Sequence, residues 1–231
     1  MLLSFLVTTL FTAAQSYNVA IFAPYMASSQ VLYNKRVGEE LAKAGHNVTI
    51  FMLHLFEKDL PMVEIDSRVH VRHINASNGL DGEKLQHLQS YTAFHKIPIW
   101  DKRAREFMVF FTEMYKSCEV IVANPSFHNM IRDSKFDIAF AHMYNYCPIG
   151  LIHVTKIPAW IWLSSGSLME NMAHSMGVPL PPSYCTPTAW MLEINSPSSR
   201  EIITNPETAV FRKQFGEEFP DLLDMAAKAP R

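Results

Sequence analysis

Polar side chains follow two apolar runs of the chain, at the points where each run ends. The first group is Ser28, Ser29 and Gln30, after residues 18–23, and the second is His142 and Tyr144, after residues 136–141. If the two runs are parallel strands of an open sheet, their carboxyl ends meet at one edge, which is where such sheets bind ligands. An imidazole can take up a proton, and amides and hydroxyls can hydrogen-bond a small molecule. These loops are therefore the first candidates for a binding or catalytic site.

The pattern around the first group predicts how it is positioned. Residues 18–23 are continuously apolar, as is typical of a strand buried on both faces. Residues 31–44 repeat apolar side chains at helical spacing, and Gly45 provides a left-handed stop. Residues 47–53 form a second apolar run, so the order strand, helix, strand predicts a right-handed unit with parallel strands.

The same alternation continues along the chain. Further strands are predicted at residues 69–74, 136–141 and 158–163, and helices at residues 100–118, 127–134, 147–155, 207–215 and 220–228. The pair Asn124-Pro125 is expected to break the helical stretch around it, because proline cannot continue a helix. The alternation indicates an α/β fold with a doubly wound, Rossmann-like parallel sheet.

Several classes of site find no support in the sequence. The turn after residues 18–23 lacks Gly-x-Gly-x-x-Gly, and no Gly-x-x-x-x-Gly-Lys motif occurs, so neither dinucleotide nor phosphate-loop binding is expected. A net charge of −2 with no long run of Lys or Arg argues against a nucleic acid partner. The ten histidines are scattered, and His70 and His73 on one strand would point to opposite faces, so no metal site is expected.

The chain has three cysteines, which are too few and odd in number for a disulfide framework. Cys147 is predicted to open a helix, where a helix N-terminus would make a thiol more acidic. The other interpretation of Cys147 is a small buried hydrophobic residue without a chemical role. The sequence leaves both interpretations open.

Residues 1–16 are typical of a secretory signal peptide. Residues 2–14 are apolar or hydroxylated and uncharged, and this run is too short to span a bilayer, which takes about 20 residues. The alternative is a buried first strand or helix. Two N-glycosylation acceptors, Asn47 and Asn75, fit a secretory route, and no later segment can cross a membrane. We therefore expect a protein of the endoplasmic reticulum lumen or a secreted one.

Several segments give the chain a resemblance to a known family. They are Leu41-Ala-Lys-Ala-Gly-His-Asn-Val-Thr49 within residues 18–53, Phe136-Asp-Ile-Ala-Phe-Ala141 with Cys147-Pro-Ile-Gly150, Gly177-Val-Pro-Leu-Pro-Pro-Ser-Tyr184, and Phe211-Arg-Lys-Gln-Phe-Gly216 with Phe219-Pro-Asp-Leu222. In this order they resemble the opening, the acidic-residue strand and its helix, the proline-rich acceptor loop and the inter-domain approach of animal UDP-glucuronosyltransferases, nematode members in particular. The similarity extends over essentially all of the chain after the signal peptide.

The resemblance implies a two-lobed GT-B glycosyltransferase, of which residues 17–231 would be the N-terminal, acceptor-binding lobe. In this family a sugar passes, with inversion, from a UDP-sugar such as UDP-glucuronic acid or UDP-glucose to a hydroxyl of a small lipophilic acceptor. A histidine after the first strand takes the proton of that hydroxyl, and an acid after the fourth strand orients the histidine. The UDP-sugar is a co-substrate, and no cofactor is expected to be bound by this lobe.

Two positions depart from the family pattern. Counting along the matching motifs, the histidine position holds Gln30 and the acid position holds His142. An amide cannot accept a proton near neutral pH, so Gln30 cannot be the base. His142 could instead act as a relocated base across the site, with Gln30 orienting the acceptor. The residues expected to bind substrate are Ser29, Gln30, His142 and Tyr184.

The sequence ends at Arg231, where the family continues into its UDP-sugar lobe and a membrane anchor. We therefore expect acceptor binding to be retained and sugar transfer by this chain alone to be weak or absent. Two alternatives stay open. One is a non-catalytic protein that binds apolar ligands or pairs with a full-length relative, and the other is an incomplete gene model. A lobe without its partner would expose a hydrophobic face.

Overall fold

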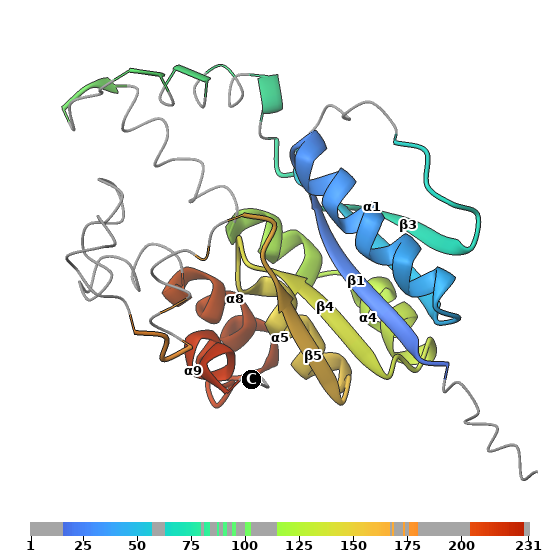
Figure 1. Ribbon diagram of the computed structural model, residues 1–231. Helices are drawn as coiled ribbons and strands as arrows, with labels where there is room; N and C mark the ends of the chain where they lie inside the picture. The colour runs from blue at the N-terminus through green and yellow to red at the C-terminus, as the bar shows by residue number, and fades with distance from the viewer. Residues whose placement is uncertain are drawn as a thin grey trace, which may run out of the picture.

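The computed structural model describes residues 16–56, 63–79, 81–83, 87, 90–91, 94–95, 100–102, 115–166, 168, 173, 176–179 and 204–228. Its centre is a sheet in the order β3-β2-β1-β4-β5, in which all neighbouring strands are parallel (Figure 1). The strands are β1 (Asn18–Tyr25), β2 (Asn47–His54), β3 (Val69–Asn75), β4 (Ile138–His142) and β5 (Ala159–Leu163). All but the last residue of the predicted signal peptide lie outside the described residues.

The order of the strands reverses at β1. Strands β2 and β3 extend the sheet on one side of β1, and β4 and β5 extend it on the other side. This is the doubly wound arrangement that the sequence pattern predicts, so the α/β, Rossmann-like fold is confirmed. The reversal places the loops after β1 and β4 next to each other at the carboxyl edge of the sheet, where such folds bind ligands.

Helices cover both faces of this sheet. They are α1 (Ser28–Lys43), α4 (Pro125–Asp133), α5 (Cys147–Thr155), α8 (Asn205–Phe215) and α9 (Leu222–Ala227), and residues 115–122 are also helical. Helix α1 packs on β1 and β2 on one face, whereas α5 packs on β4 on the other face and contacts α4, α8 and α9 (Figure 1). The helix predicted at residues 100–118 falls largely outside the described residues.

Strand β1 is longer than its apolar run predicts, because it passes through Pro24 and ends at Tyr25. The pairing of β1 with β4 ends at Phe22, whereas the pairing with β2 continues to the last residue of β1. Beyond Phe22 the strand has a partner on one side only, and a residue without an N–H group is tolerated there. The proline therefore marks the end of the central part of the sheet and not the end of the strand.

Two glycines shape α1. A Cβ at Gly38 would meet Cδ1 of Ile50, on β2, at 2.8 Å, so the missing side chain lets the helix lie close to the sheet. The helix ends at Lys43, and Gly45 follows as the predicted left-handed stop, with a φ of +95° in the region that favours glycine.

The predicted break at Asn124-Pro125 is also the start of a helix. Oδ1 of Asn124 accepts a hydrogen bond of 3.1 Å from the backbone N–H of Phe127 and so caps α4. Pro125 lies in the first turn, where a missing N–H group leaves no intrahelical hydrogen bond unmade. The dipeptide thus ends the helix of residues 115–122 and begins α4.

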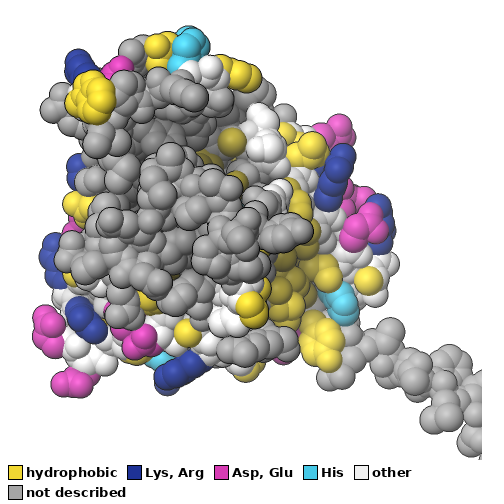
Figure 2. Space-filling view, turned by 60° about the vertical axis from the view of Figure 1, so that its left-hand side comes forward, with side chains coloured by type: hydrophobic (Ala, Val, Ile, Leu, Met, Phe, Trp, Pro, Cys, Tyr) yellow, Lys and Arg dark blue, Asp and Glu magenta, His cyan; other side chains and the backbone are white. Residues whose placement is uncertain are grey.

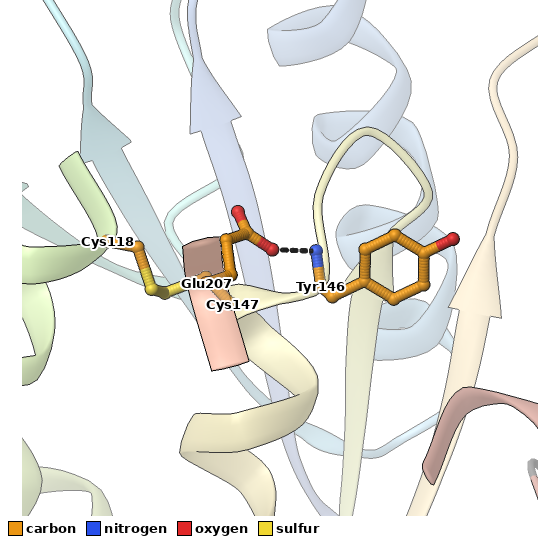
Figure 3. Close-up of a disulfide and its surroundings, with 4 residues drawn as sticks. All are labelled: Cys118, Tyr146, Cys147 and Glu207. Atoms are coloured by element: carbon orange, nitrogen blue, oxygen red, sulfur yellow. Dashed lines mark hydrogen bonds between the residues drawn. A yellow bond between two sulfur atoms is a disulfide. The ribbon is translucent and has the colours of Figure 1, made fainter. Parts of the chain in front are cut away.

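Cys118 and Cys147 form a disulfide that joins residues 115–122 to the first residue of α5 (Figure 3). Both cysteines are buried. The interpretation of Cys147 as an acidic thiol is therefore wrong. The other interpretation, a small buried hydrophobic residue, is confirmed for its burial but misses the disulfide. The two residues are 29 positions apart in no recognisable motif, and only the fold brings them together.

The side chain of Glu207, on α8, reaches the N-terminus of α5 beside this disulfide (Figure 3). Its Oε2 accepts a hydrogen bond of 2.7 Å from the backbone N–H of Tyr146, and the backbone N–H of Cys147 also bonds to the carboxyl group. The first turn of a helix leaves such N–H groups without intrahelical partners, and Pro148 has none to satisfy. Burial raises the pKa of Glu207 to about 8, although both backbone N–H groups act to lower it.

Gly150, within α5, lets this helix pack against Phe211 of α8. A Cβ at Gly150 would overlap the end of the Phe211 ring. That ring is fully buried and stacked on Phe219, with 4.9 Å between the ring centroids, so it has no room to move away. We predict that Gly150→Ala lowers the free energy of unfolding by about 2 kcal/mol, measured by urea denaturation, because the core becomes overpacked.

Gly38→Ala is the matched control for this prediction, because it also adds a methyl group within a helix that packs on the core. There the new Cβ meets the end of the flexible Ile50 side chain. The gain of about 1 kcal/mol in helix propensity should offset most of the adjustment, so the change in stability should be small. Wild-type stability in Gly150→Ala would contradict the tight packing of α5 on α8.

On the face shown in Figure 2, the described residues carry side chains of both charges between hydrophobic ones. Ile161, on the edge strand β5, is 43% exposed. None of the helices in the described ranges is both long and apolar enough to span a membrane.

Candidate functional site

Three loops bring four polar side chains together at the carboxyl edge of the sheet. Gln30 comes from the first turn of α1, His142 from the end of β4, Tyr144 from the turn after β4, and Ser165 from the loop after β5. The hydroxyl of Ser165 donates to Oε1 of Gln30 at 2.8 Å, and Nε2 of Gln30 donates to Oη of Tyr144 at 2.7 Å. Nε2 of His142 lies 3.2 Å from Oγ of Ser165. The structure thus brings Gln30 and His142 into one site, with Ser165 between them.

The hydrogen bonds of this group run in one direction. The single proton of Ser165 goes to Gln30, so Ser165 can only accept from His142, which carries its proton on Nε2. Nδ1 of His142 then holds a lone pair, and this buried atom has no hydrogen-bond partner among the described residues. If every hydrogen bond of the group were reversed, Nδ1 of His142 would carry a buried N–H without a partner. A buried N–H without a partner is rarer in proteins than a buried acceptor without one. We name these four residues the polar chain, which runs from His142 through Ser165 and Gln30 to Tyr144.

Aromatic rings hold His142 in place. Its imidazole stacks on the ring of Tyr144 with 4.5 Å between centroids, and Tyr33 of α1 meets it edge-on at 6.2 Å. His142 is 3% exposed, and this burial lowers the pKa of its imidazole to about 4. The imidazole is therefore neutral near pH 7.

We predict that the buried His142 makes the protein less stable in mild acid. Because the folded-state pKa of about 4 lies below the ordinary value of 6.5, the unfolded chain binds more protons between these two values. The contribution of His142 to the free energy of unfolding should therefore fall by about 2 kcal/mol from pH 7 to pH 5. The measurement is urea denaturation of wild type and His142→Gln across this range, with the stability of wild type relative to the variant falling in acid.

His70→Gln is the control, because His70 lies exposed on β3. Its stability should follow that of wild type at every pH. If wild type and His142→Gln instead change in parallel, His142 is not held neutral by the fold.

The sequence predicts only part of this site. Ser29 is exposed on the first turn of α1 and takes no part in the polar chain, and Tyr184 lies outside the described residues. Ser165 is not singled out by any motif. However, it follows the fifth predicted strand, and ligands of such sheets bind at the carboxyl ends of the strands.

A pair of histidines lies on the strands β2 and β3. Nε2 of His54 and Nδ1 of His73 are 2.7 Å apart, and the ring of Tyr25 packs on His54 with 4.4 Å between centroids. The partner of His73 is thus on the neighbouring strand and not on its own strand, where the sequence offers His70. In the part of the chain that the structure describes, no three His, Cys, Asp or Glu side chains gather into a metal site.

Both predicted glycosylation acceptors are exposed, at opposite ends of the sheet. Asn47 begins β2, and its Nδ2 donates to Oδ1 of Asn18 at 2.9 Å. Asn75 ends β3, and its Oδ1 accepts from the backbone N–H of Ser77, the hydroxyl residue of its own acceptor triplet, at 2.9 Å.

Comparison with known proteins relates the chain to one family. Residues 20–216 match the family model described as UDP-glucoronosyl and UDP-glucosyl transferase. The Caenorhabditis elegans protein named as a UDP-glucuronosyltransferase, ugt-48, is 26% identical over 89% of this chain and 42% of its own length. The similarly named ugt-46 and ugt-47 of that organism are 25% and 26% identical, over 96% and 91% of this chain and 44% and 42% of their own lengths. The chain therefore spans less than half the length of these curated relatives. Because the family model covers most of the chain, the protein belongs to the UDP-glucuronosyl and UDP-glucosyl transferase family.

Proposed function

We propose that the chain forms the acceptor-binding lobe of a UDP-glycosyltransferase. Its carboxyl edge would bind a small lipophilic acceptor, whose hydroxyl receives a sugar from UDP-glucuronic acid or UDP-glucose. The observation that carries the proposal is that Gln30 and His142, which the family resemblance assigns to the base and acid positions, meet through Ser165. They do so at the loops after β1 and β4, where the strand order reverses and doubly wound sheets bind ligands.

Proton removal is the step for which this site is poorly equipped. An alcohol becomes a good nucleophile only when a group of suitable pKa takes its proton. The amide of Gln30 cannot do so, and both of its polar atoms are already hydrogen-bonded, to Ser165 and Tyr144. His142 is the alternative base, but a base must come within about 3 Å of the hydroxyl, and its Nδ1, which has no partner among the described residues, is buried.

We therefore propose that acceptor binding is retained while sugar transfer is weak or absent. Loss of the catalytic base lowers the rate by about 10²–10⁴ even when binding is intact. The purified chain, incubated with UDP-glucuronic acid or UDP-glucose and 4-nitrophenol, should bind 4-nitrophenol in equilibrium dialysis without forming product. Product formation that His142→Ala abolishes would identify His142 as the base. Absence of 4-nitrophenol binding would contradict the acceptor-binding proposal itself.

A second candidate function is that of a non-catalytic partner of a full-length family member. The carboxamide of Gln30 favours it, because a group held by two hydrogen bonds at the base position can bind a ligand but cannot start the reaction. Co-expression with a tagged full-length member tests this function. A partner would copurify with that member and change its rate of glucuronosyl transfer, whereas an independent ligand-binding protein would do neither.

We also propose that the protein enters the secretory pathway. The disulfide between Cys118 and Cys147 supports this location, because disulfides persist in oxidising compartments such as the endoplasmic reticulum lumen. The exposed positions of Asn47 and Asn75 are compatible with glycans. After expression in eukaryotic cells, endoglycosidase digestion should lower the mass of the wild type, and Asn47→Gln and Asn75→Gln should each reduce that shift.

A further inference from the structure

We propose that the polar chain makes this site a hydrogen-bond donor, so that the hydroxyl of Tyr144 selects lipophilic ligands with an acceptor oxygen, such as aryl ketones. The inference rests on the proposed function, since it concerns the ligand of the same site. A catalytic base at the position of Gln30 would present a lone pair to the hydroxyl proton of a ligand. The described side chains instead present a hydrogen-bond donor, the hydroxyl of Tyr144.

The direction of the polar chain makes this hydroxyl the donor. His142 donates to Ser165, Ser165 donates to Gln30, and Gln30 donates to Tyr144. Oη of Tyr144 is therefore an acceptor towards Gln30, which leaves its own O–H as the last donor of the chain. Hydrogen bonds in series polarise one another, so a hydroxyl that already accepts a hydrogen bond is a better donor.

Two members of the polar chain are buried and two are partly exposed. His142 is 3% exposed and Gln30 is 7% exposed, whereas Ser165 and Tyr144 are partly exposed. The proton of Ser165 is already used by Gln30, so of these two partly exposed residues Tyr144 is the one whose hydroxyl proton is available for a ligand. Tyr144 and Met26 are partly buried and pack against the hydrophobic core on the α5 side of the sheet.

Tyr144 is held before any ligand arrives. Its ring stacks on the imidazole of His142 with 9° between the planes, and its oxygen is fixed by Gln30 at 2.7 Å. A donor that is already oriented loses little conformational entropy when it binds, so its hydrogen bond contributes more of its strength to affinity. The arrangement favours recognition of an oxygen at one defined position.

The test compares two probes of similar size, 2-acetonaphthone with a carbonyl oxygen and 2-ethylnaphthalene without one. Equilibrium dialysis with the full chain gives their dissociation constants for wild type and Tyr144→Phe. We expect Tyr144→Phe to weaken binding of 2-acetonaphthone about fivefold, as loss of one neutral hydrogen bond does, and to leave 2-ethylnaphthalene unchanged. Tyr33→Phe is the matched control, because its ring also contacts His142 while its hydroxyl is outside the polar chain.

Gln30→Glu provides a second variant, in case Tyr144→Phe does not fold. A carboxylate has no proton to donate, so the hydroxyl of Tyr144 would turn inward towards it. This variant should lose the preference for the ketone in the same way.

The outcomes distinguish failure of this inference alone from failure of the proposed function. If both probes bind wild type and Tyr144→Phe weakens both equally or neither, the donor role is wrong and acceptor binding stands. If neither probe binds wild type, the acceptor-binding function and the inference fail together. A selective loss for the ketone in Tyr144→Phe, absent in Tyr33→Phe, is the result that supports the donor role.

Discussion

Replacing both bridged cysteines, in Cys118→Ala/Cys147→Ala, should lower the free energy of unfolding by about 3–4 kcal/mol. The disulfide closes a loop of 29 residues, and a crosslink of that span restricts the unfolded chain by about this amount. In the folded protein the same bond ties the helix of residues 115–122 to the start of α5, where both cysteines are buried. Urea denaturation of the variant and the wild type under oxidising conditions measures the difference.

A reducing agent provides the control within the same experiment. In its presence the wild type should fall to the stability of the double variant, while the double variant should not respond. Peptide mapping without reduction should recover Cys118 and Cys147 in one linked fragment. A wild type that is equally stable with and without reductant would show that the bridge contributes nothing.

The fold could be predicted from the sequence because its signals are local. Continuous apolar runs mark strands buried on both faces, and the helical period of residues 31–44 together with Gly45 marks the crossover between the first two strands. Such patterns depend on neighbours within a few positions. They can therefore be recognised without knowledge of the tertiary structure. The observed strand bounds differ from the predicted ones by two residues at most.

The contacts that the sequence does not predict join residues far apart in the chain. Ser165 bonds to Gln30 across 135 positions, and Glu207 bonds to Tyr146 across 61. Locally, a glutamate in the first turn of α8 is an ordinary solvent-facing residue that suits the helix dipole. Its burial and its hydrogen bonds become visible only when α8 packs against the start of α5. The same holds for the disulfide, whose cysteines belong to two different helices.

Glu207→Ala should lower the free energy of unfolding by about 3 kcal/mol, because it leaves the backbone N–H groups of Tyr146 and Cys147 buried without a partner. Glu207→Gln should retain most of the stability near neutral pH, since its side-chain carbonyl can accept the hydrogen bond from Tyr146 in the same volume. The comparison of the two variants by urea denaturation separates loss of the acceptor from loss of the acid. Equal destabilisation in both would mean that the carboxyl group matters for its proton and not as a cap.

The pH dependence of this pair follows from the direction of the pKa shift. Burial raises the pKa of Glu207 from 4.5 to about 8, so between these values the folded protein holds a proton that the unfolded chain releases. The stabilisation that Glu207 gains from this bound proton is complete below pH 4.5 and is lost as the pH rises through about 8. Stability of the wild type relative to Glu207→Gln should therefore fall from pH 5 to pH 9, opposite in sign to the effect of His142. Glu217→Gln, at an exposed position after α8, is the control and should show no such change. If the stability difference between wild type and Glu207→Gln were the same at every pH, the carboxyl group of Glu207 would be ionised in the folded protein.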